Sequence, residues 1–480
     1  MTFKRKALRI SGAFLITGLM SSCALIHHDT APHAQIAAKD IKLASDIHLA
    51  SDGWPDAQWW TRFNDPQLDA LIERALAGSP TMATARLRVT QAQAQVDEVR
   101  AEGGPQIGGL GVVMRGRGPA SGFLVPMSPW YTAGLLGVFG TWTIDLWGKN
   151  RSSVRAAIGE ENASVAEAAS AQLGLATGVA QAYYSMQMSY RQLDLFQQSK
   201  QVLEFIVQAH QDKYARGVEA RTSLQSARAQ LLALEQQVTA ARSQILETRE
   251  GIRALIGAGA DDMPEIKPAP LPEAVLSGVP STLSYALLAR RADLQAMRWE
   301  VESSLDQVEA AKAAFYPSLN ISAFYGLNAI PLSKLFKSAS QQVNLIPGLY
   351  LPIFDSGSLN AQLHSARASS DIKIEQYNQA VLDAVRDVAV NGSQLQTLAD
   401  KRKLQADKLE ATRYSQSAAE ARYEQGLGSR LAAMEARLPV IEEQASLLSI
   451  DGQWVNQQIA LIKALGGGYD AEAPASQVAQ

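Results

Sequence analysis

The stretch Tyr214-Ala-Arg-Gly217 decides the fold, because it recurs about 210 positions further on as Tyr423-Glu-Gln-Gly426. Other landmarks keep nearly the same spacing: Pro105 with Pro317, Trp147 with Phe354, and Gly257 with Gly467. This period is far longer than the roughly 20 to 50 residues of a solenoid unit. The sequence therefore predicts two copies of one half-domain, repeat 1 at residues 53–257 and repeat 2 at 282–465, joined by a proline-rich linker at 258–281 and followed by a tail at 466–480.

Each repeat is predicted to contain a long helical hairpin, at about 149–257 and about 358–465, with the Tyr-x-x-Gly motif as its turn. No clear helix breaker occurs between Gly148 and about Gln211, which predicts a helix of roughly 60 residues. On the returning helices, apolar or small residues alternate at spacings of three and four, as in a coiled coil. These seam positions are Leu231, Leu234, Val238, Ala241, Ile245, Thr248, Ile252 and Leu255 in repeat 1, and Leu438, Ile441, Ala445, Leu448, Gly452, Val455, Ile459 and Ile462 in repeat 2.

A shorter helix is predicted to precede these hairpins. Asp65 is a suitable N-cap, and Pro66 suits the first helical position because its missing N–H has no partner there in any case. The helix is expected to stop at Gly78-Ser79-Pro80 and to restart as a second helix that runs to about Ala101.

Four stretches alternate between apolar and polar residues, at about 107–115, 131–147, 319–328 and 342–354. A period of two over roughly nine to eleven residues is typical of strands that cross a membrane within a barrel. Four strands are too few, since single-chain barrels have at least about eight, and unpaired strand edges cannot face lipid. We therefore expect several chains to pool their strands. The alternative from the pattern alone is a soluble sheet on a coiled-coil stalk.

The N-terminus has the layout of a secretory signal, residues 1–22, in which basic residues precede an apolar stretch from Ile10 to Met20. The stretch runs into Leu19-Met20-Ser21-Ser22-Cys23, which resembles a bacterial lipoprotein box with Cys23 as the lipidated residue. Cys23 is the only cysteine, so no internal disulfide is possible. Residues 23–52 are expected to form a loose, lipidated N-terminal tail. Its histidines His27, His28 and His33 are expected to be plain polar residues rather than metal ligands.

Composition and motifs exclude several classes of function. A net charge of −3 and a pI near 6.1, without a basic stripe, argue against a nucleic-acid partner. The six histidines are scattered, and no Gly-rich phosphate loop follows a strand. We therefore expect that the protein is not an enzyme and that it has neither a cofactor nor a metal site. A purely structural periplasmic coiled-coil lipoprotein remains an alternative, although it has no use for four amphipathic strands.

Several further motifs carry a resemblance to a known family over nearly the whole mature chain. They are Trp54…Trp59-Trp60…Phe63-Asn-Asp65-Pro66, Ile144-Asp-Leu-Trp-Gly148, Phe315-Tyr-Pro-Ser318, Leu351-Pro-Ile-Phe-Asp-Ser-Gly357 and the paired Tyr-x-x-Gly turns. With these motifs the chain resembles the TolC/OprM outer-membrane efflux family, in its NodT-type lipoprotein branch. The resemblance implies a mixed, mainly α fold that assembles as a homotrimer, with a 12-stranded transmembrane β-barrel above a periplasmic α-barrel of helical hairpins. Four strands from each of three chains agree with that number.

The resemblance also implies a function: a passive exit duct in the outer membrane, anchored to outer-membrane lipid and opened by a periplasmic adaptor protein. An inner-membrane efflux transporter would feed it. The duct would serve multidrug efflux or, alternatively, secretion of another substrate class. Tyr214, Gly217, Tyr423 and Gly426 would then lie at the periplasmic tip and contact the adaptor, although the turns are also explained by ordinary helix capping.

The family also implies a charged constriction at the tip. Family members carry acids six and nine residues beyond the tip glycine, positions that Ala432 and Glu435 occupy here, so only the second acid is present. In a trimer, three Glu435 carboxylates would surround a narrow bore and favour the entry of cations. Arg430 is a candidate ion-pair partner across subunits. A solvated charged face is the equally weighted alternative.

Overall fold

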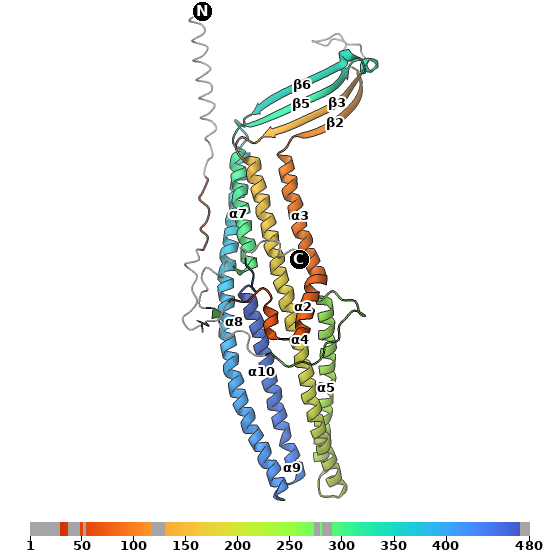
Figure 1. Cartoon of the computed structure of the whole chain (residues 1–480), viewed down its shortest axis with the longest axis vertical. Helices are drawn as coiled ribbons and strands as arrows, with labels where there is room; N and C mark the ends of the chain where they lie inside the picture. Colours follow the sequence, from red (N-terminus) through yellow and green to blue (C-terminus); the bar gives the residue numbers. More distant parts are fainter. Residues whose placement is uncertain are drawn as a thin grey trace, which may run out of the picture. The chain divides into compact units, whose positions relative to one another are not determined.

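The structure is a computed structural model that describes residues 29–36, 49–50, 54–117, 130–272, 279–280 and 290–470 (Figure 1). The chain divides into two compact units. The first, here the sheet unit, comprises Met1–Gln35, Arg88–Ser164 and Ala296–Asn378. The second, here the hairpin unit, comprises Ile36–Leu87, Val165–Gln295 and Gln379–Gln480.

Helices make up most of the described chain, and a 3₁₀ turn, η2 (Trp59–Phe63), comes before them. They are α2 (Pro66–Gly78), α3 (Pro80–Glu102), α4 (Lys149–Ala215), α5 (Arg221–Leu255), α7 (Ala292–Ala313), α8 (Ser358–Glu424), α9 (Arg430–Glu435) and α10 (Arg437–Ala464). The long helices α4 and α8 each contain 67 residues, or about 100 Å at the usual rise. Among the described residues, no helix combines the length and the apolarity that a membrane crossing requires.

The four predicted strands form one antiparallel sheet in the sheet unit, in the order β2-β3-β5-β6. Their bounds are β2 (Gln106–Arg117), β3 (Trp130–Ile144), β5 (Ser318–Ala329) and β6 (Gln341–Tyr350), and two short 3₁₀ turns, η3 (Leu332–Lys334) and η4 (Ser338–Ser340), separate the last two. The central pair, β3 with β5, joins repeat 1 to repeat 2. A separate parallel pair joins β1 (Leu49–Ala50) to β4 (Val279–Pro280). The mixed, mainly α fold with four strands is therefore confirmed.

Two strands end earlier than the alternating pattern suggested. The expected 131–147 stretch ends at Ile144, because the carboxylate of Asp145 accepts the Arg151 N–H at 3.0 Å and turns the chain into α4. The expected 342–354 stretch ends at Tyr350, and Asp355 accepts the N–H groups of Gly357 and Leu359 at 3.0 and 2.6 Å before α8. In both repeats an aspartate cap therefore replaces the last residues of the strand.

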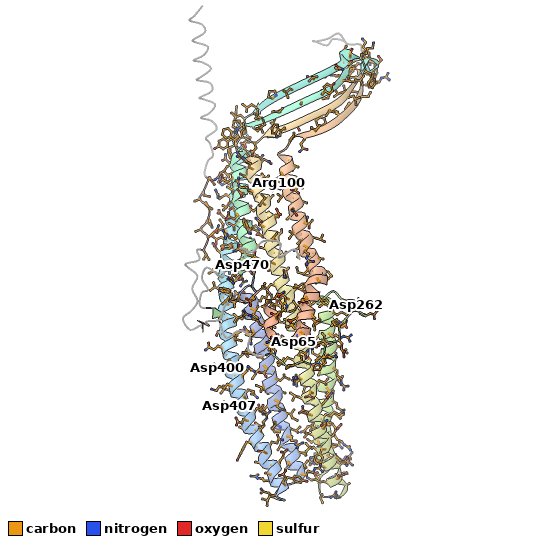
Figure 2. All side chains as sticks on the ribbon, in the orientation of Figure 1. Asp65, Arg100, Asp262, Asp400, Asp407 and Asp470 are labelled. Carbon is orange, nitrogen blue, oxygen red and sulfur yellow. The ribbon has the colours of Figure 1, made fainter. Side chains whose placement is uncertain are left out.

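The predicted start of α2 is confirmed, and its cap is tied to the centre of the hairpin unit (Figure 2). Asp65 Oδ1 accepts the Gln67 N–H at 3.0 Å, with Pro66 as the first helical residue. Its other oxygen, Oδ2, accepts a hydrogen bond of 2.7 Å from the buried hydroxyl of Tyr183 on α4. Burial, followed by the hydrogen bond to Asp65, raises the pKa of Tyr183, so this hydroxyl remains a donor at ordinary pH.

Side-chain amides attach part of the proline-rich linker to the hairpin unit. Gln187 on α4 donates to the carbonyl of Lys267 at 3.0 Å and accepts the N–H of Ala269 at 2.7 Å. Gln67 on α2 makes a similar reciprocal pair with the backbone of Lys267. The hydroxyl of Tyr190 donates to the Ile266 carbonyl at 3.1 Å. A segment with many prolines offers few N–H groups for a sheet, and these amides satisfy its backbone groups instead.

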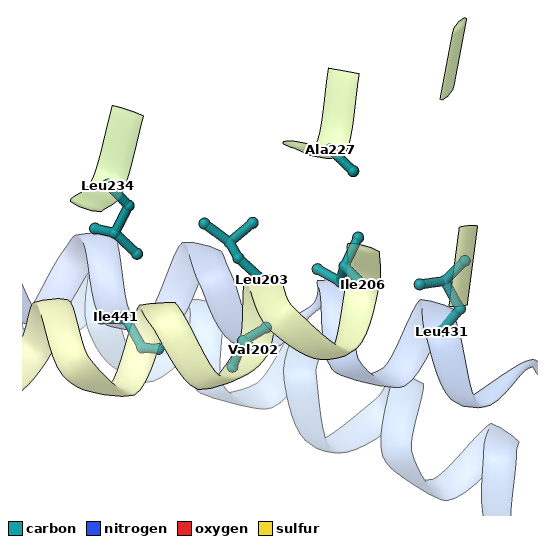
Figure 3. Packing of buried hydrophobic residues seen from close by; sticks show 7 residues of the cluster. All are labelled: Val202, Leu203, Ile206, Ala227, Leu234, Leu431 and Ile441. Carbon is teal, nitrogen blue, oxygen red and sulfur yellow. The ribbon is translucent and has the colours of Figure 1, made fainter. Parts of the chain in front are cut away.

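The two hairpins share a hydrophobic core near their turns, which Figure 3 shows from close by. It contains Val202, Leu203 and Ile206 of α4, Ala227 and Leu234 of α5, Leu431 of α9 and Ile441 of α10. Every predicted seam position of α5 and α10 is buried or half-buried, and the intervening positions of α5 are mostly exposed. The coiled-coil-like packing of the hairpins is confirmed.

The returning helix of repeat 2 differs from the expected continuous helix. It is divided into α9 and α10 at Ala436. Pro439 explains the break, because it has no N–H for the carbonyl of Glu435 and its ring would clash with that carbonyl in a regular helix. Ser429 caps α9 by accepting the Ala432 N–H at 3.1 Å.

Part of the N-terminal tail is held against the helices of the sheet unit, which corrects the expectation of a loose tail there. Asp29 accepts hydrogen bonds of 2.8 to 3.1 Å from the buried guanidinium of Arg367 on α8 and lies 2.6 Å from Lys312 Nζ on α7. The ring of His33 lies 2.8 Å from the Glu375 carboxylate, and its backbone N–H donates to Asp371. Residues 29–36 are called the N-terminal strap below.

Candidate functional site

The two Tyr-x-x-Gly turns of the hairpin unit have the same backbone geometry. Gly217 and Gly426 both lie in the left-handed region, with φ of +70° and +74°. Each glycine N–H donates to the carbonyl of the motif tyrosine at 2.9 Å, and the next N–H reaches back five residues to a helix carbonyl. This is the Schellman arrangement, which glycine favours because it has no Cβ. The expected capping role of the glycines is confirmed.

The same turns expose matching side chains. Tyr214 and Tyr423 are each 42% exposed, and the residues after the glycines, Val218 and Leu427, are 73% and 76% exposed. An apolar side chain with so little cover at the tip of each hairpin stabilises neither hairpin by burial. Both turns therefore present an aromatic ring and an apolar side chain to whatever lies beyond them.

The side chains beneath the two turns differ. In repeat 1, His210 Nδ1 lies 2.8 Å from Glu219 Oε2, and the pair links α4 to the turn. The corresponding positions in repeat 2 are Ala419 and Gly428, and the Ser429 cap serves there instead. Neither His210 nor Glu219 was predicted to be a site residue. The sequence does place His210 and Glu219 on either side of the Tyr214 turn, and this could have predicted their pairing because the turn brings the two sides together.

Arg430 and Glu435, the two proposed gate residues, stand at opposite ends of α9. The Arg430 guanidinium lies over the ring of Phe205 on α4, 4.8 Å from its centroid, a favourable cation–π geometry. Glu435 is exposed and lines a groove of about 480 Å³ between the hairpin helices. The groove is also lined by His210, Thr222, Ser223, Ser226, Gln230 and three apolar residues. Within one chain, then, Arg430 packs on Phe205 and Glu435 borders a polar groove.

One face of the sheet carries most of the exposed, large apolar side chains of the four strands. The strand register places these exposed side chains on it together: Ile107 and Val113 of β2, Leu136, Val138 and Trp142 of β3, Tyr325 of β5, and Val343, Leu345 and Leu349 of β6. This set is called the apolar face below. The opposite face carries Asn320, Ser322, Asn328, Gln342 and Asn344 among smaller and apolar residues. The predicted alternation is confirmed in β5, β6 and the last part of β3, but in β2 the predicted apolar residues Leu110, Val112 and Met114 lie on the opposite face. The described residues leave the apolar face exposed over four strands.

Aromatic side chains fix the corner between sheet and helices. The ring of Trp147 stacks on Tyr316 at a centroid distance of 5.0 Å, and its Nε1 donates to the carbonyl of Pro317 at 2.8 Å. Trp142 Nε1 donates to the Gly103 carbonyl at 3.1 Å. Both indole N–H groups are therefore hydrogen-bonded at the helix-side end of the sheet. Cys23, the proposed lipidation site, lies outside the described residues.

Comparison with known proteins agrees with this architecture. The model of the family described as outer membrane efflux protein matches two separate segments, residues 71–258 and 283–467. The chain is 57% identical over 465 residues to the multidrug resistance outer membrane protein MdtP of Escherichia coli strain K12, covering 95% of each. The two matched segments confirm the internal repeat. The identity confirms a resemblance to MdtP that three strings also suggest: Gly53–Trp60, Leu255–Lys267 and Asp387–Gly392.

Solved structures have the same fold. The outer membrane protein VceC of Vibrio cholerae aligns with a TM-score of 0.78 and 30% identity, over 87% of this chain and 100% of that chain. The CmeC outer membrane channel of Campylobacter jejuni aligns with a TM-score of 0.83 at 20% identity, over 94% and 96%, and supports the fold alone. Long helical hairpins with a four-stranded sheet thus define the class of outer-membrane channel proteins. The chain belongs to the outer membrane efflux protein family.

Proposed function

We propose that this protein is the exit duct of a tripartite efflux pump: a homotrimer, lipid-anchored at Cys23, whose hairpins form a periplasmic tunnel. The observation that carries the proposal is the sheet, which combines an uncovered apolar face with two outer strands, β2 and β6, that pair on one side only among the described residues. Unpaired backbone groups are not tolerated in lipid. Pairing of β6 with β2 of a neighbouring chain satisfies both edges, and three chains close twelve strands.

The tip of the hairpin unit supplies the proposed contact with a periplasmic adaptor. Tyr214 and Tyr423, with Val218 and Leu427 beside them, are exposed on two turns of equal geometry. Exposed aromatic and apolar side chains on rigid turns are suitable anchors for a partner that packs helix against helix. The adaptor would couple the duct to an inner-membrane transporter, which supplies the energy because the duct itself is passive.

Glu435 is the proposed gate residue. It is exposed at the end of α9, next to the shared core of the two hairpins, and borders a polar groove rather than an apolar one. In a trimer, three such carboxylates would meet round the closed tip and attract cations. The relative MdtP is named for multidrug resistance, so we propose several unrelated drugs as the exported compounds of this protein as well.

Membrane extraction and native mass spectrometry test the duct together with its anchor. The full-length protein is extracted from the outer membrane in an uncharged detergent, and the mass of the complex is measured. We expect a trimer that carries the acyl groups. For Cys23→Ser we expect the same trimer, still in the membrane and without acyl mass, because acyl chains only add to membrane attachment. A Cys23→Ser protein recovered in the soluble periplasmic fraction would refute a membrane-spanning sheet.

Export itself is measured in cells that lack their own outer-membrane duct but retain an adaptor and a transporter. Expression of this protein is expected to lower the accumulation of a fluorescent drug. Substituting both Tyr214 and Tyr423 by Ser should abolish the effect while the trimer remains intact. Tyr414→Ser is the matched control, because Tyr414 is 77% exposed on α8 away from the turns.

A further inference from the structure

Positive charge without any negative charge is concentrated at one end of the sheet. The whole chain has 47 acidic residues and a net charge of −3, but no aspartate or glutamate occurs in residues 103–144 or 310–354. These two segments contain all four strands and their connections. The cationic residues that they place in the sheet and its connections are Arg115, Arg117, Lys334 and Lys337. In a chain that is acidic overall, this distribution indicates an anionic partner.

All four cations lie at the end of the sheet remote from the helices. Strands β2 and β5 begin close after helices, β3 and β6 end close before helices, and Arg117 is the last residue of β2. Its register partner is Trp130, the first residue of β3. Lys334 and Lys337 are exposed in the connection between β5 and β6, which lies at the same end (Figure 1).

The two arginines lie on the same side of the sheet as the apolar face, at its end. Arg115 and Arg117 continue the register row of Ile107 and Val113, and both side chains are exposed. Their guanidinium carbons lie 5.8 and 6.0 Å from the ring centroid of Trp130. The indole ring thus orients both guanidinium groups while their N–H donors remain available, because a cation–π contact uses the face of the group and not its hydrogen-bond donors.

The second pair of cations flanks an apolar side chain. Phe336, between Lys334 and Lys337, is 80% exposed, and Trp130 is 58% exposed. Aromatic rings next to cations, at the border of an apolar face, match the composition expected where acyl chains meet headgroups. An aqueous anion would require no such apolar surface beside its site.

We infer that Arg115, Arg117 and Trp130, called the basic aromatic cluster, bind the phosphate groups of an anionic membrane lipid whose acyl chains lie along the apolar face. A guanidinium group matches phosphate oxygens with two parallel hydrogen bonds. Lys334 and Lys337 add charge at the same end. The inference rests on the proposed function, since it requires the apolar face to lie in a bilayer, and it adds a specific lipid site.

Native mass spectrometry of the full-length trimer tests the site, with lipid A, a glycolipid with two phosphates, as the probe and its dephosphorylated form as the comparison. We expect lipid A to be retained about tenfold more tightly. The double variant R115Q/R117Q should lose this preference, and Trp130→Leu should reduce it roughly threefold. The matched control K401Q/K403Q removes two exposed charges from α8 and should keep it.

Each outcome decides a different point. Equal retention of both lipids by the wild type, or an unchanged preference in R115Q/R117Q, overturns the lipid site. Displacement of lipid A by millimolar inorganic phosphate assigns the cluster to free anions and also overturns it, whereas resistance to displacement supports it. The mass of the complex is read in the same spectrum. A missing trimer contradicts the proposed duct, while a trimer without lipid preference contradicts this inference alone.

Discussion

The hydroxyl of Tyr183 on α4 donates a hydrogen bond of 2.7 Å to Asp65, the carboxylate that caps α2. One carboxylate therefore both starts a helix and ties it to the middle of the longest helix of its repeat. Both residues are buried, so neither can exchange its partner for water without a rearrangement.

Tyr183→Phe is expected to lower the free energy of unfolding by about 1–3 kcal/mol, because it leaves Asp65 Oδ2 buried without this donor. Asp65→Ala should cost more, since the helix cap is lost as well. Tyr414→Phe, at a 77% exposed position, is the control and should change nothing. The apparent melting temperature of the detergent-extracted protein measures all three, and equal values for Tyr183→Phe and the control would contradict the assignment.

Gly217→Ala and Gly426→Ala are each expected to destabilise their turn by about 1–2 kcal/mol, the cost of a left-handed conformation for a residue with a Cβ. Space is not the reason, because an added Cβ would meet no atom within 4 Å at either position. Hydrogen exchange of the turn amides should become faster.

Gly174→Ala supplies a control of opposite sign for the turn variants. Gly174 lies within α4, and an added Cβ there also meets nothing within 4 Å. We expect it to stabilise the helix by up to about 1 kcal/mol. If all three substitutions had the same sign, backbone conformation would not be the controlling factor.

Asp29→Asn is expected to release the N-terminal strap. The substitution removes the negative charge that faces the buried Arg367 and the half-buried Lys312. Burial raises the pKa of Asp29, but hydrogen bonds from Lys312 and Arg367 outweigh it and the net pKa is lowered. The ionised form thus holds the strap at every pH above the ordinary value of 3.8 and is lost only as the pH falls through the lowered pKa. Limited proteolysis at pH 7 should cut the variant strap faster, and Asp407→Asn on α8 should behave as wild type (Figure 2).

His33 makes the stability of the N-terminal strap depend on pH in a second, higher range. The hydrogen bond to Glu375 and the nearby Asp371 raise the pKa of His33 above its ordinary 6.5. A raised pKa means that the stabilisation is fully present below 6.5 and is lost as the pH rises through the raised value. Hydrogen exchange of the strap, corrected for the intrinsic rate, should therefore accelerate across this window. His33→Gln should remove the dependence; a variant that retains it would exclude His33 as its source.

Glu435→Ala is expected to raise the single-channel conductance of the closed duct in a planar bilayer, because the loss of three large side chains should widen the tip. The loss of their charges should at the same time lower its preference for cations. Glu410→Ala, an exposed carboxylate on α8, is the matched control. Unchanged conductance in Glu435→Ala would exclude this residue from the gate.

Local sequence signals were sufficient for the elements whose causes are local. Asp65 and Pro66 identify a helix start because capping involves only the next few residues. The three-and-four spacing of the seam residues predicts which side of α5 is buried, since a helix places those positions on one face. The break at Ala436 could also have been predicted from the sequence, because Pro439 alone accounts for it.

Contacts between distant residues were not predictable in this way. Arg367 and Asp29 are 338 positions apart, and neither has a neighbouring motif that indicates its partner. The pairing of β3 with β5 is likewise set by how the repeats fit together and not by either strand alone. In the candidate site, the Tyr-x-x-Gly turns were recognisable from the amino-acid sequence. The cation–π contact of Arg430 with Phe205 was not, because the two residues belong to different hairpins.

The inequality of the two turns has a consequence for any ring built from this chain. Their backbones match, but only the turn of repeat 1 is supported by the pair of His210 and Glu219. Three chains would place six turns around the rim, in which the turn of repeat 1 alternates with the turn of repeat 2. For a binder that contacts only the tyrosine and the glycine, the rim would have sixfold symmetry. For a binder that also reaches the histidine it is threefold. A binder that contacts only the turn residues could therefore bind the rim in six copies, whereas one that also contacts His210 could bind in three.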